Sequence, residues 1–362
     1  MRTVLCIAAA ALAATGCNDA NDPRPRPRAA KPTPAPTPAT APAREPDTRL
    51  TISVSGDLLP HLPVVARART SDGYDFAPLL RDLRPLVRRA DLAFCHVETP
   101  LQPGAPQGYP RFRTPPALAR AIRRTGWDAC STASNHTLDQ GVAGVRSTIR
   151  ALNRAGVTHT GSAMTRRGGR RILLLRRRGV SVAFLSYTQH TNGLPVPHPW
   201  SVNLATPRRI LDDARRARRK GAAAVIVNLH WGTEYRHSPD AYQVRMARRL
   251  TRGRAVTAVV GQHAHVVQPI RRMNRNWVVY GTGNLLSNQS AACCAAATQD
   301  GMVVTLRLRV RGGRARVETV RYAPTYVRHP DMRVLRVRRG TPSWTRTTRV
   351  VGRRKGLRPS RR

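Results

Sequence analysis

The stretch "VVGQHAHVVQPI" at residues 259–270 places His263 and His265 directly after an apolar run and a glycine. Such a run is typical of a buried β-strand, and in an extended segment two side chains separated by one residue point the same way. Two neutral imidazoles that converge on one point suit a metal ion. Taken alone, the pair fits two solvated histidines beyond a strand end equally well, so the rest of the chain has to decide.

The same arrangement recurs along the chain, because apolar runs alternate with amphipathic segments. Strands are expected at residues 49–56, 91–97, 128–134, 180–187, 223–230, 255–261 and 276–283. Helices are expected near residues 78–89, 115–126, 142–155, 207–220 and 239–253. This alternation predicts an α/β fold with substantial parallel pairing. Gly312-Gly313, between two later alternating runs, predicts a β-hairpin.

Potential ligands follow most of these strands. In chain order the clusters are Asp57 and His61; His96 and Glu98; Asn135, His136 and Asp139; His230 and Glu234; His263 and His265; Asn284 and Gln289. Sites in open α/β sheets assemble at the carboxyl ends of strands, and this oxygen and nitrogen donor set suits Mn, Fe or Zn. Each residue also has a plain structural interpretation, such as Asp57 capping a turn or Asn135 capping a helix. Their recurrence at successive strand ends favours a metal site.

The N-terminal residues predict export. Residues 1–17 have a positive start and an apolar run at Val4–Ala14 that is too short to span a bilayer comfortably, as in a signal peptide. The "AATGC" that ends at Cys17 resembles the lipobox of bacterial lipoproteins, with ordinary secretion as the alternative. Residues 18–48 are rich in Pro, Ala and Thr, which predicts an extended linker. We therefore expect a domain at residues 49–330, held by a lipid anchor on the extracellular face of the cell membrane.

The composition limits the class of partner. The chain has 362 residues, 41% of them hydrophobic, which suffices for one large α/β domain or two smaller ones. Its formal net charge of +44 comes almost entirely from arginine. For an exported protein this charge favours an anionic extracellular polymer or a membrane over nucleic acid, although a general preference for Arg would give the same charge as solvated background. The Arg-rich tail at residues 331–362 is expected to be disordered.

Four cysteines lie beyond the signal: Cys95, Cys130, Cys293 and Cys294. Their spacing matches no CxxC metal knuckle, which excludes a zinc-finger interpretation. Outside the cytoplasm they allow one or two disulfides, and the pairing cannot be read from the sequence. We expect the adjacent Cys293 and Cys294 to bond to other cysteines rather than to each other.

Six short motifs, in order, carry a family resemblance over about residues 50 to 325: "GD", "ETPL", "SNHTLDQG", "LHWGTEY", "GQHAHVVQ" and "YGTGNL". Together they resemble the CapA proteins of capsule or poly-γ-glutamate synthesis, whose domain is similar to the calcineurin-like metallophosphoesterases. The resemblance implies a four-layer sandwich, with two mixed β-sheets flanked by helices. It also implies a site for two divalent transition-metal ions, such as Mn, Fe or Zn, across the strand ends.

The resemblance further implies roles for single residues. One metal would be held by Asp57, His61 and His265, and the other by Asn135, His230 and His263. Glu98 would replace the bridging aspartate of ordinary metallophosphoesterases, and His136 matches the histidine that acts on the leaving group.

Two departures from the family pattern put turnover in doubt. The Glu98 side chain is one methylene longer than aspartate, and His96 stands where the family usually has Asn. The main hypothesis is a surface-tethered, metal-dependent hydrolase that works on an anionic polymer or with a capsule-synthesis membrane complex. The alternatives are a non-catalytic polymer-binding assembly protein on the same fold and an exported phosphodiesterase or nucleotidase.

Overall fold

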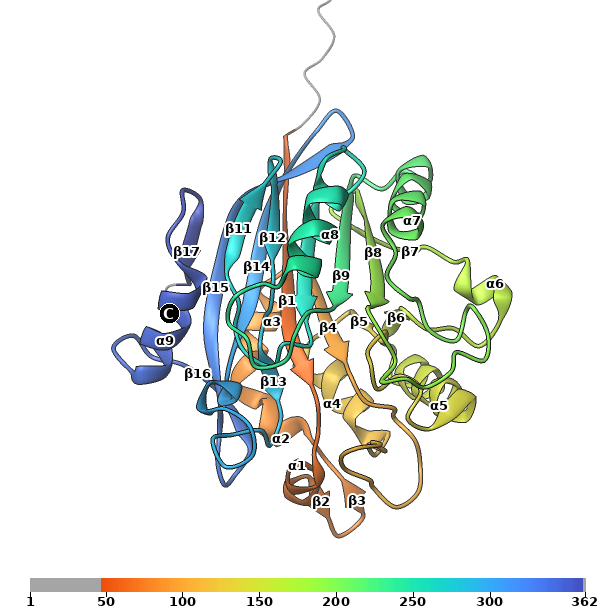
Figure 1. The fold of residues 1–362 in the computed structure, drawn as a ribbon, viewed down its shortest axis with the longest axis vertical. Coiled ribbons are helices and arrows are strands. Elements are labelled where there is room, and N and C mark those ends of the chain that lie inside the picture. Colours follow the sequence, from red (N-terminus) through yellow and green to blue (C-terminus); the bar gives the residue numbers. More distant parts are fainter. Residues whose placement is uncertain (1–46, 361–362) are drawn as a thin grey trace, which may run out of the picture. The chain divides into compact units, whose positions relative to one another are not determined.

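A computed structural model describes residues 47–360, which form two mixed β-sheets with helices around them (Figure 1). The predicted signal peptide at residues 1–17 and the predicted linker as far as residue 46 lie outside the described residues. The first strand begins at Thr48, the last residue assigned to the linker. Within residues 47–360, no helix combines the length and the apolar character that a membrane crossing needs.

The larger sheet has nine strands. Its order is β16 (Arg333–Arg336), β15 (Arg314–Arg328), β14 (Asp300–Arg311), β1 (Thr48–Leu58), β4 (Leu92–Val97), β5 (Ala129–Ser131) and β6 (Thr158–Thr160). Two further strands join it off this path: β13 (Asn284–Leu286) pairs with β1, and β17 (Leu357–Pro359) pairs with β15. The sheet is mixed, because β1 runs parallel to β4 and antiparallel to β14.

The smaller sheet has six strands. Its order is β11 (Ile270–Met273), β12 (Asn276–Val279), β10 (Ala258–Gln262), β9 (Ala224–His230), β8 (Val180–Thr188) and β7 (Leu173–Arg177). The strands β8, β9, β10 and β12 are mutually parallel, whereas β7 and β11 pair antiparallel at the two edges. A separate two-stranded sheet joins β2 (Arg69–Thr70) and β3 (Gly73–Tyr74).

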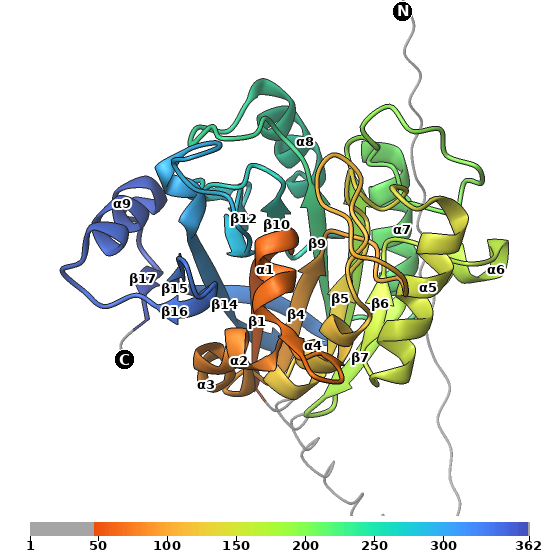
Figure 2. The ribbon, with the colours of Figure 1, turned by 90° about the horizontal axis from the view of Figure 1, so that it is seen from below.

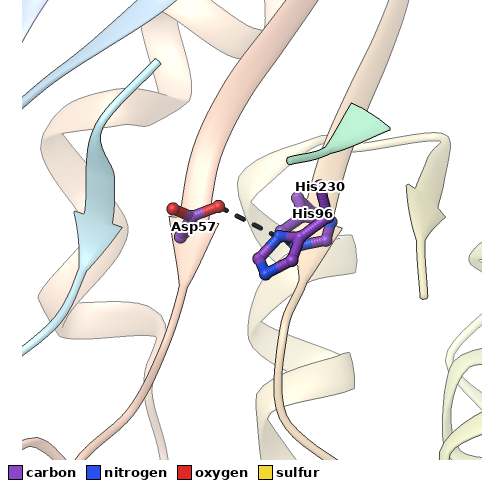
Figure 3. A group of neighbouring side chains, drawn as sticks. All are labelled: Asp57, His96 and His230. Carbon is purple, nitrogen blue, oxygen red and sulfur yellow. Dashed lines mark ion pairs between the residues drawn. The ribbon is translucent and has the colours of Figure 1, made fainter. Parts of the chain in front are cut away.

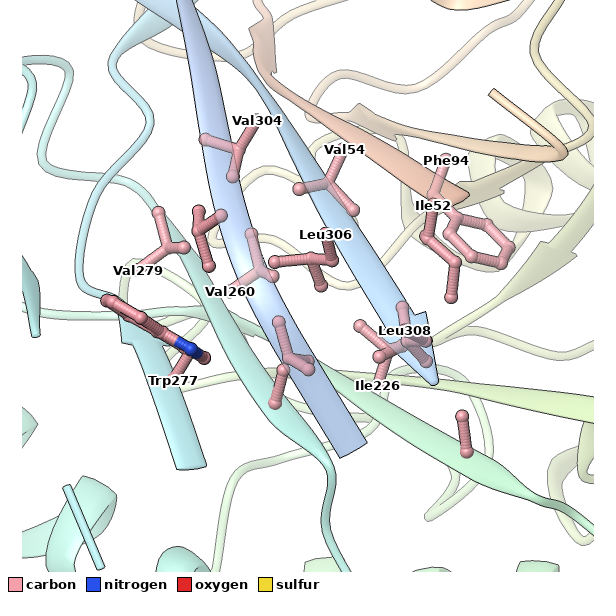
Figure 4. Close-up of a cluster of buried hydrophobic side chains, with 14 of the residues drawn as sticks. Ile52, Val54, Phe94, Ile226, Val260, Trp277, Val279, Val304, Leu306 and Leu308 are labelled. Carbon is pink, nitrogen blue, oxygen red and sulfur yellow. The ribbon is translucent and has the colours of Figure 1, made fainter. Parts of the chain in front are cut away.

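The main core lies between the two sheets. Ile52 and Val54 alternate with polar residues along β1, so their side chains share one face and meet Val260 of the smaller sheet (Figure 4). Phe94 of β4 stacks on Phe184 of β8, with ring centroids 4.0 Å apart. The inner faces of both sheets are therefore apolar, as sheet-on-sheet packing requires.

Helices cover the outer faces. The larger sheet packs against α1 (Leu62–Arg67), α2 (Ala77–Leu80), the 3-10 helix η1 (Arg81–Leu83), α3 (Arg84–Arg88) and α4 (Ala117–Thr125), with α5 (Gly141–Arg154) beside them. The smaller sheet packs against α7 (Pro207–Arg219) and α8 (Ala241–Thr251). Figure 2 shows α8 and the α2–α3 pair on opposite sides of the sheets. The remaining elements are α6 (Arg166–Gly169), η2 (Ala296–Gln299) and α9 (Pro342–Val351). The predicted four-layer sandwich of two mixed sheets flanked by helices is confirmed.

Most predicted elements are present, and two predictions need correction. The hairpin forms between β14 and β15, with positive φ at Gly312 and Gly313. The helix expected near 78–89 is broken into α2, η1 and α3, because Pro85 has no N–H to continue the earlier helix. The tail predicted to be disordered instead forms β16, α9 and β17, since Val334, Val351 and Leu357 are buried in the hydrophobic cores. The fold therefore extends to residue 359, beyond the predicted boundary at 330.

The cysteines separate into a bonded pair and a free pair. Cys95 of β4 and Cys130 of β5 face each other in adjacent parallel strands and form a disulfide. Cys293 and Cys294 are free thiols. Within residues 47–360 neither forms a disulfide with the other or with another cysteine, so the expected preference for other cysteines stays a prediction.

Candidate metal centre

The strand ends gather the predicted ligands at one edge of the sandwich. Asp57 of β1 and His96 of β4 are register partners in parallel neighbours, and Glu98 follows β4 directly. His230 is the last residue of β9, and Gln262 ends β10 one residue before His263. Parallel strands bring their carboxyl ends to a common edge, so residues far apart in sequence meet here.

Four overlapping groups have ligand atoms within 4.8 Å of one another. They are Asp57, Glu98 and His265; Glu98, His230 and His263; Asp57, His96 and His230; and Glu234, His263 and His265. Apart from Glu234, each of these residues is at most 3% exposed. Glu98 belongs to two groups that otherwise share no member, so its carboxylate is common to both.

His96 joins the cluster beside two predicted ligands (Figure 3). Its Nε2 lies 3.8 Å from Oδ1 of Asp57, and its Nδ1 lies 2.6 Å from Oγ of Ser131. Ser131 Oγ also accepts hydrogen bonds from Ser186 Oγ and from Asn228 Nδ2. This polar network fixes the ring so that Nε2 faces Asp57.

His230 is at the centre of the second group. Its Nε2 lies 2.8 Å from Oδ1 of Asn135, 3.1 Å from Nδ1 of His263 and 3.5 Å from Oε1 of Glu98. Asn135 Nδ2 donates in turn to Oδ1 of Asn192, in the long loop after β8. The structure therefore brings Asn135, His230 and His263 together around the Glu98 carboxylate.

His265 approaches the same carboxylate oxygen of Glu98 as His230 does. Its Nδ1 lies 3.0 Å from Oδ1 of Asn284 and 3.4 Å from Oδ2 of Asp57, and its Nε2 lies 3.8 Å from Oε1 of Glu98. Glu234 approaches the same nitrogen from the half-exposed rim, at 3.9 Å. Asp57, Glu98 and Glu234 thus surround this imidazole with carboxylates.

The backbone is bent, not extended, at His263 and His265, the two histidines that follow β10. His263 has φ 89° and His265 has φ 55°, in the left-handed region that residues other than glycine rarely adopt. The expectation of an extended segment is therefore wrong, although the two rings still lie close, with centroids 5.9 Å apart. The His263 N–H donates to Oδ2 of Asp57 at 3.2 Å, which helps to hold the turn. Strained residues of this kind are concentrated at functional sites.

Several buried polar atoms of the cluster have no hydrogen-bond partner among residues 47–360. They are Oδ1 of Asp57, both carboxylate oxygens of Glu98, Nε2 of His96 and Nδ1 of His230. Burying such groups without partners is unfavourable by several kcal/mol in an apolar environment. A cation among these atoms would provide the missing partner, and carboxylate with imidazole suits Mn, Fe or Zn. The residues present therefore fit a divalent metal.

The electrostatics favour the neutral imidazoles that bind metals. Burial, reinforced by neighbouring histidines, holds the pKa of His230 and of His263 well below the usual value. Burial also lowers the pKa of His96 to about 4, although Asp57 opposes the shift. Burial raises the pKa of Glu98 well above its usual range. For His265, burial lowers the pKa, but Glu98 and Asp57 together raise it to about 9. All but one of these imidazoles are thus ready to bind a metal without first losing a proton.

His136 and His61 lie at the rim. Nδ1 of His136 lies 2.8 Å from Oδ2 of Asp139, an oxygen that also accepts the Phe112 N–H at 2.7 Å. The rings of His61 and His136 both pack edge-on against Phe112, with centroids 5.2 and 4.8 Å away. Nδ1 of His61 faces the Leu59 carbonyl oxygen at 3.0 Å. His61 belongs to none of the four ligand groups, so its role as a ligand stays a prediction.

Three residues of the cluster were potential ligands to which the resemblance assigned no metal: His96, Glu234 and Asn284. Each follows or ends a predicted strand, so the sequence signal was present. The positions of His96 and Asn284 opposite Asp57 depend on the register of β4 and β13 against β1, which the motifs do not specify.

Comparisons with known proteins agree on one family. Residues 51–289, about two thirds of the chain, match the family profile described as "Bacterial capsule synthesis protein PGA_cap". The chain is 24% identical over 277 residues to the capsule biosynthesis protein CapA of Bacillus anthracis, which covers 73% of this chain and 65% of that protein. It is 23% identical to the PGA biosynthesis protein CapA of Bacillus subtilis strain 168, and the match covers 74% of this chain and 70% of that protein.

The chain thus spans about two thirds of the length of these curated relatives. Among solved structures, it is similar to the calcineurin-like phosphoesterase YfkN from Bacillus subtilis. That similarity has a TM-score of 0.49 and 15% identity, and covers 77% of this chain and 91% of that one.

Proposed function

The chain belongs to the PGA_cap family of bacterial capsule synthesis proteins, and on that premise we propose that it is a metal-dependent hydrolase in the assembly of capsule or poly-γ-glutamate. One observation carries the proposal: buried carboxylate and imidazole atoms without partners converge at the strand ends. We further propose two divalent ions, Mn, Fe or Zn, because Glu98 is common to two otherwise separate ligand groups.

Different residues bind the metals and transfer the proton in the proposed reaction. Six of them would hold the metals: Asp57, Glu98, Asn135, His230, His263 and His265. When bound, two such ions lower the pKa of a coordinated water and neutralise charge that develops on a phosphoryl or acyl oxygen. His136 has its Nδ1 fixed by Asp139, which leaves Nε2 to give a proton to the departing oxygen.

The location and partners belong to the same proposal. The signal-like start and Cys17 support export and a lipid anchor on the extracellular face of the membrane. The net charge of +44 supports an anionic extracellular polymer as the partner, directly or within a capsule-synthesis membrane complex.

The metal centre is tested by metal content. The purified chain, after reconstitution with Mn, Fe or Zn, is analysed by plasma mass spectrometry beside Asp57→Ala and His263→Ala. We expect about two equivalents in the parent and less in both variants. His198→Ala is the matched control, because His198 is exposed and stacks on Trp200 outside the ligand groups. A folded parent protein that takes up no metal would exclude the centre.

Turnover needs a separate experiment. Simple phosphoesters and poly-γ-glutamate are screened with the metal-loaded protein and with His136→Ala. Loss of a general acid should lower the rate by about 10²- to 10⁴-fold while metal content stays unchanged.

The second candidate is a non-catalytic assembly protein on the same fold. The observation that favours it is Glu98, which is one methylene longer than the aspartate of ordinary metallophosphoesterases. A metal-loaded protein that hydrolyses neither class of compound, yet binds the polymer, would favour this candidate.

A further inference from the structure

The C-terminal segment builds a second concave site. The helix α9 packs on β15 and β14, and β17 pairs with β15, so both lie beside the outer strands of the larger sheet (Figures 1 and 2). Between α9, β17, β15 and the turn after β16 lies a cleft with a volume of about 1510 Å³. None of the residues that line it belongs to the metal-ligand groups.

The lining of this cleft carries charge of one sign. No acidic residue lines it, and seven of its residues are arginines: Arg321, Arg336, Arg338, Arg339, Arg349, Arg353 and Arg358. They come from β15, the β16 end, α9 and β17, so positive charge surrounds the cleft from several elements. We call these residues the arginine cleft.

The arginine cleft brings arginines from several elements around one concavity that has no carboxylate in its described lining. Some arginines elsewhere are paired with carboxylates, as in Arg309 with Asp47 and Arg346 with Asp300. Leaving Arg336 aside, no arginine of the cleft has an ion pair with any residue from 47 to 360. Like charges held together without counterions repel one another, and a bound polyanion relieves that repulsion.

We propose that the arginine cleft binds an acidic polypeptide. Guanidinium groups pair with carboxylates through two parallel hydrogen bonds, and a cleft larger than an ordinary small-molecule pocket can hold a segment of an extended chain. Trp344 is the one partly exposed aromatic residue in the lining, and Tyr322 is buried. Single-stranded nucleic acid would therefore lack the series of stacking surfaces that such ligands use. The identity of the polypeptide as poly-γ-glutamate rests on the proposed function, whereas the cleft itself does not.

Binding of labelled poly-γ-glutamate to the full chain tests the proposal. Fluorescence anisotropy gives Kd for the parent, for the triple variant R349Q/R353Q/R358Q, and for the control triple R120Q/R123Q/R245Q. The control removes the same charge from exposed positions of α4 and α8, outside the cleft. Because each exposed pair contributes modestly, we expect the cleft triple to raise Kd by roughly tenfold and the control to change it by less than about twofold.

The outcomes separate this inference from the proposed function. An equal rise in Kd for both triple variants would mean that the polymer is attracted by the net charge alone, which would refute a binding site in the cleft. The cleft could instead bind single-stranded DNA or phosphatidylglycerol vesicles and leave poly-γ-glutamate unbound. That result would refute an acidic polypeptide as the ligand. The cleft triple should keep the metal content of the parent. A parent protein that takes up no metal and hydrolyses neither class of compound, yet binds the polymer through the cleft, would refute only the proposed function.

Discussion

At the scale of single residues, Glu98 has opposite effects on metal binding and on the stability of the metal-free protein. Both of its carboxylate oxygens are buried and lack a hydrogen-bond partner, and burial raises the pKa of this group. We expect Glu98→Gln to weaken metal binding at least about tenfold, since it removes the charge common to two ligand groups. The metal-free variant should be as stable as the parent or more so, by about 1 kcal/mol, because the cluster then buries one ionisable carboxyl group fewer.

Thermal unfolding with and without chelator measures both effects. Chelation should lower the Tm of the parent by more than that of Glu98→Gln, because a metal stabilises only the state that binds it and binds the variant more weakly. An equal drop in both proteins would show that Glu98 is not a ligand.

His159 gives a prediction for pH that is independent of the metal centre. Burial, with Arg171 nearby, lowers its pKa to about 4, and its Nδ1 has no hydrogen-bond partner. As the pH falls, His159 of the unfolded chain therefore binds a proton near pH 6.5, whereas His159 of the folded protein binds it only near pH 4. His159 thus has no effect on the pH dependence of stability above pH 6.5, and the free energy of unfolding falls by about 3 kcal/mol as the pH drops from 6.5 to 4. Replacing His159 with Gln should flatten the dependence of the unfolding free energy on pH by this amount, measured by urea denaturation. Identical slopes would contradict the prediction.

At the scale of elements, the contact between β1 and β13 places Asp57. A Cβ atom on Gly56 would lie 1.9 Å from the carbonyl oxygen of Gly283, so only glycine permits this approach. We expect Gly56→Ala to destabilise the protein by about 2 kcal/mol or more and to weaken metal binding, because the strands must separate beside Asp57. Gly253→Ala is the matched control, since nothing lies within 4 Å of its Cβ position. Urea denaturation and metal titration of both variants measure the difference, and equal stabilities would refute the steric argument.

The same scale shows what the sequence could and could not predict. Strands such as β1 and β9 were predictable, because their apolar runs are continuous or alternate strictly. The site edge was predictable because ligands follow those strands. The bent backbone at His263 and His265 was not, since periodicity says nothing about φ beyond a strand end. The C-terminal strands and α9 were missed because a few apolar residues, such as Val351, are spaced among many arginines.

At the scale of the whole molecule, the C-terminal segment is part of the fold and not only a carrier of charge. Met332, Val334, Val351 and Leu357 are each less than 8% exposed. Val351 and Leu357 belong to the core between the sheets, and Met332 and Val334 to the core beneath the helices. The arginine cleft is built on this packed segment, so the structure that completes the larger sheet also positions the proposed polymer site.

A chain that ends at Pro330 should therefore be unstable. It loses these four buried apolar side chains, among others, and β15 loses its partners β16 and β17 along one edge. At about 1.5 kcal/mol or more for each buried side chain, we expect a loss on the order of 5 kcal/mol. The exposed edge of β15 should also promote aggregation, because its N–H and C=O groups are left to pair with other chains. A chain that ends at Ser360 is the control and should behave like the parent in thermal unfolding and size-exclusion chromatography. Equal Tm values for the two shortened chains would show that residues 331–360 add nothing to the stability of the sandwich.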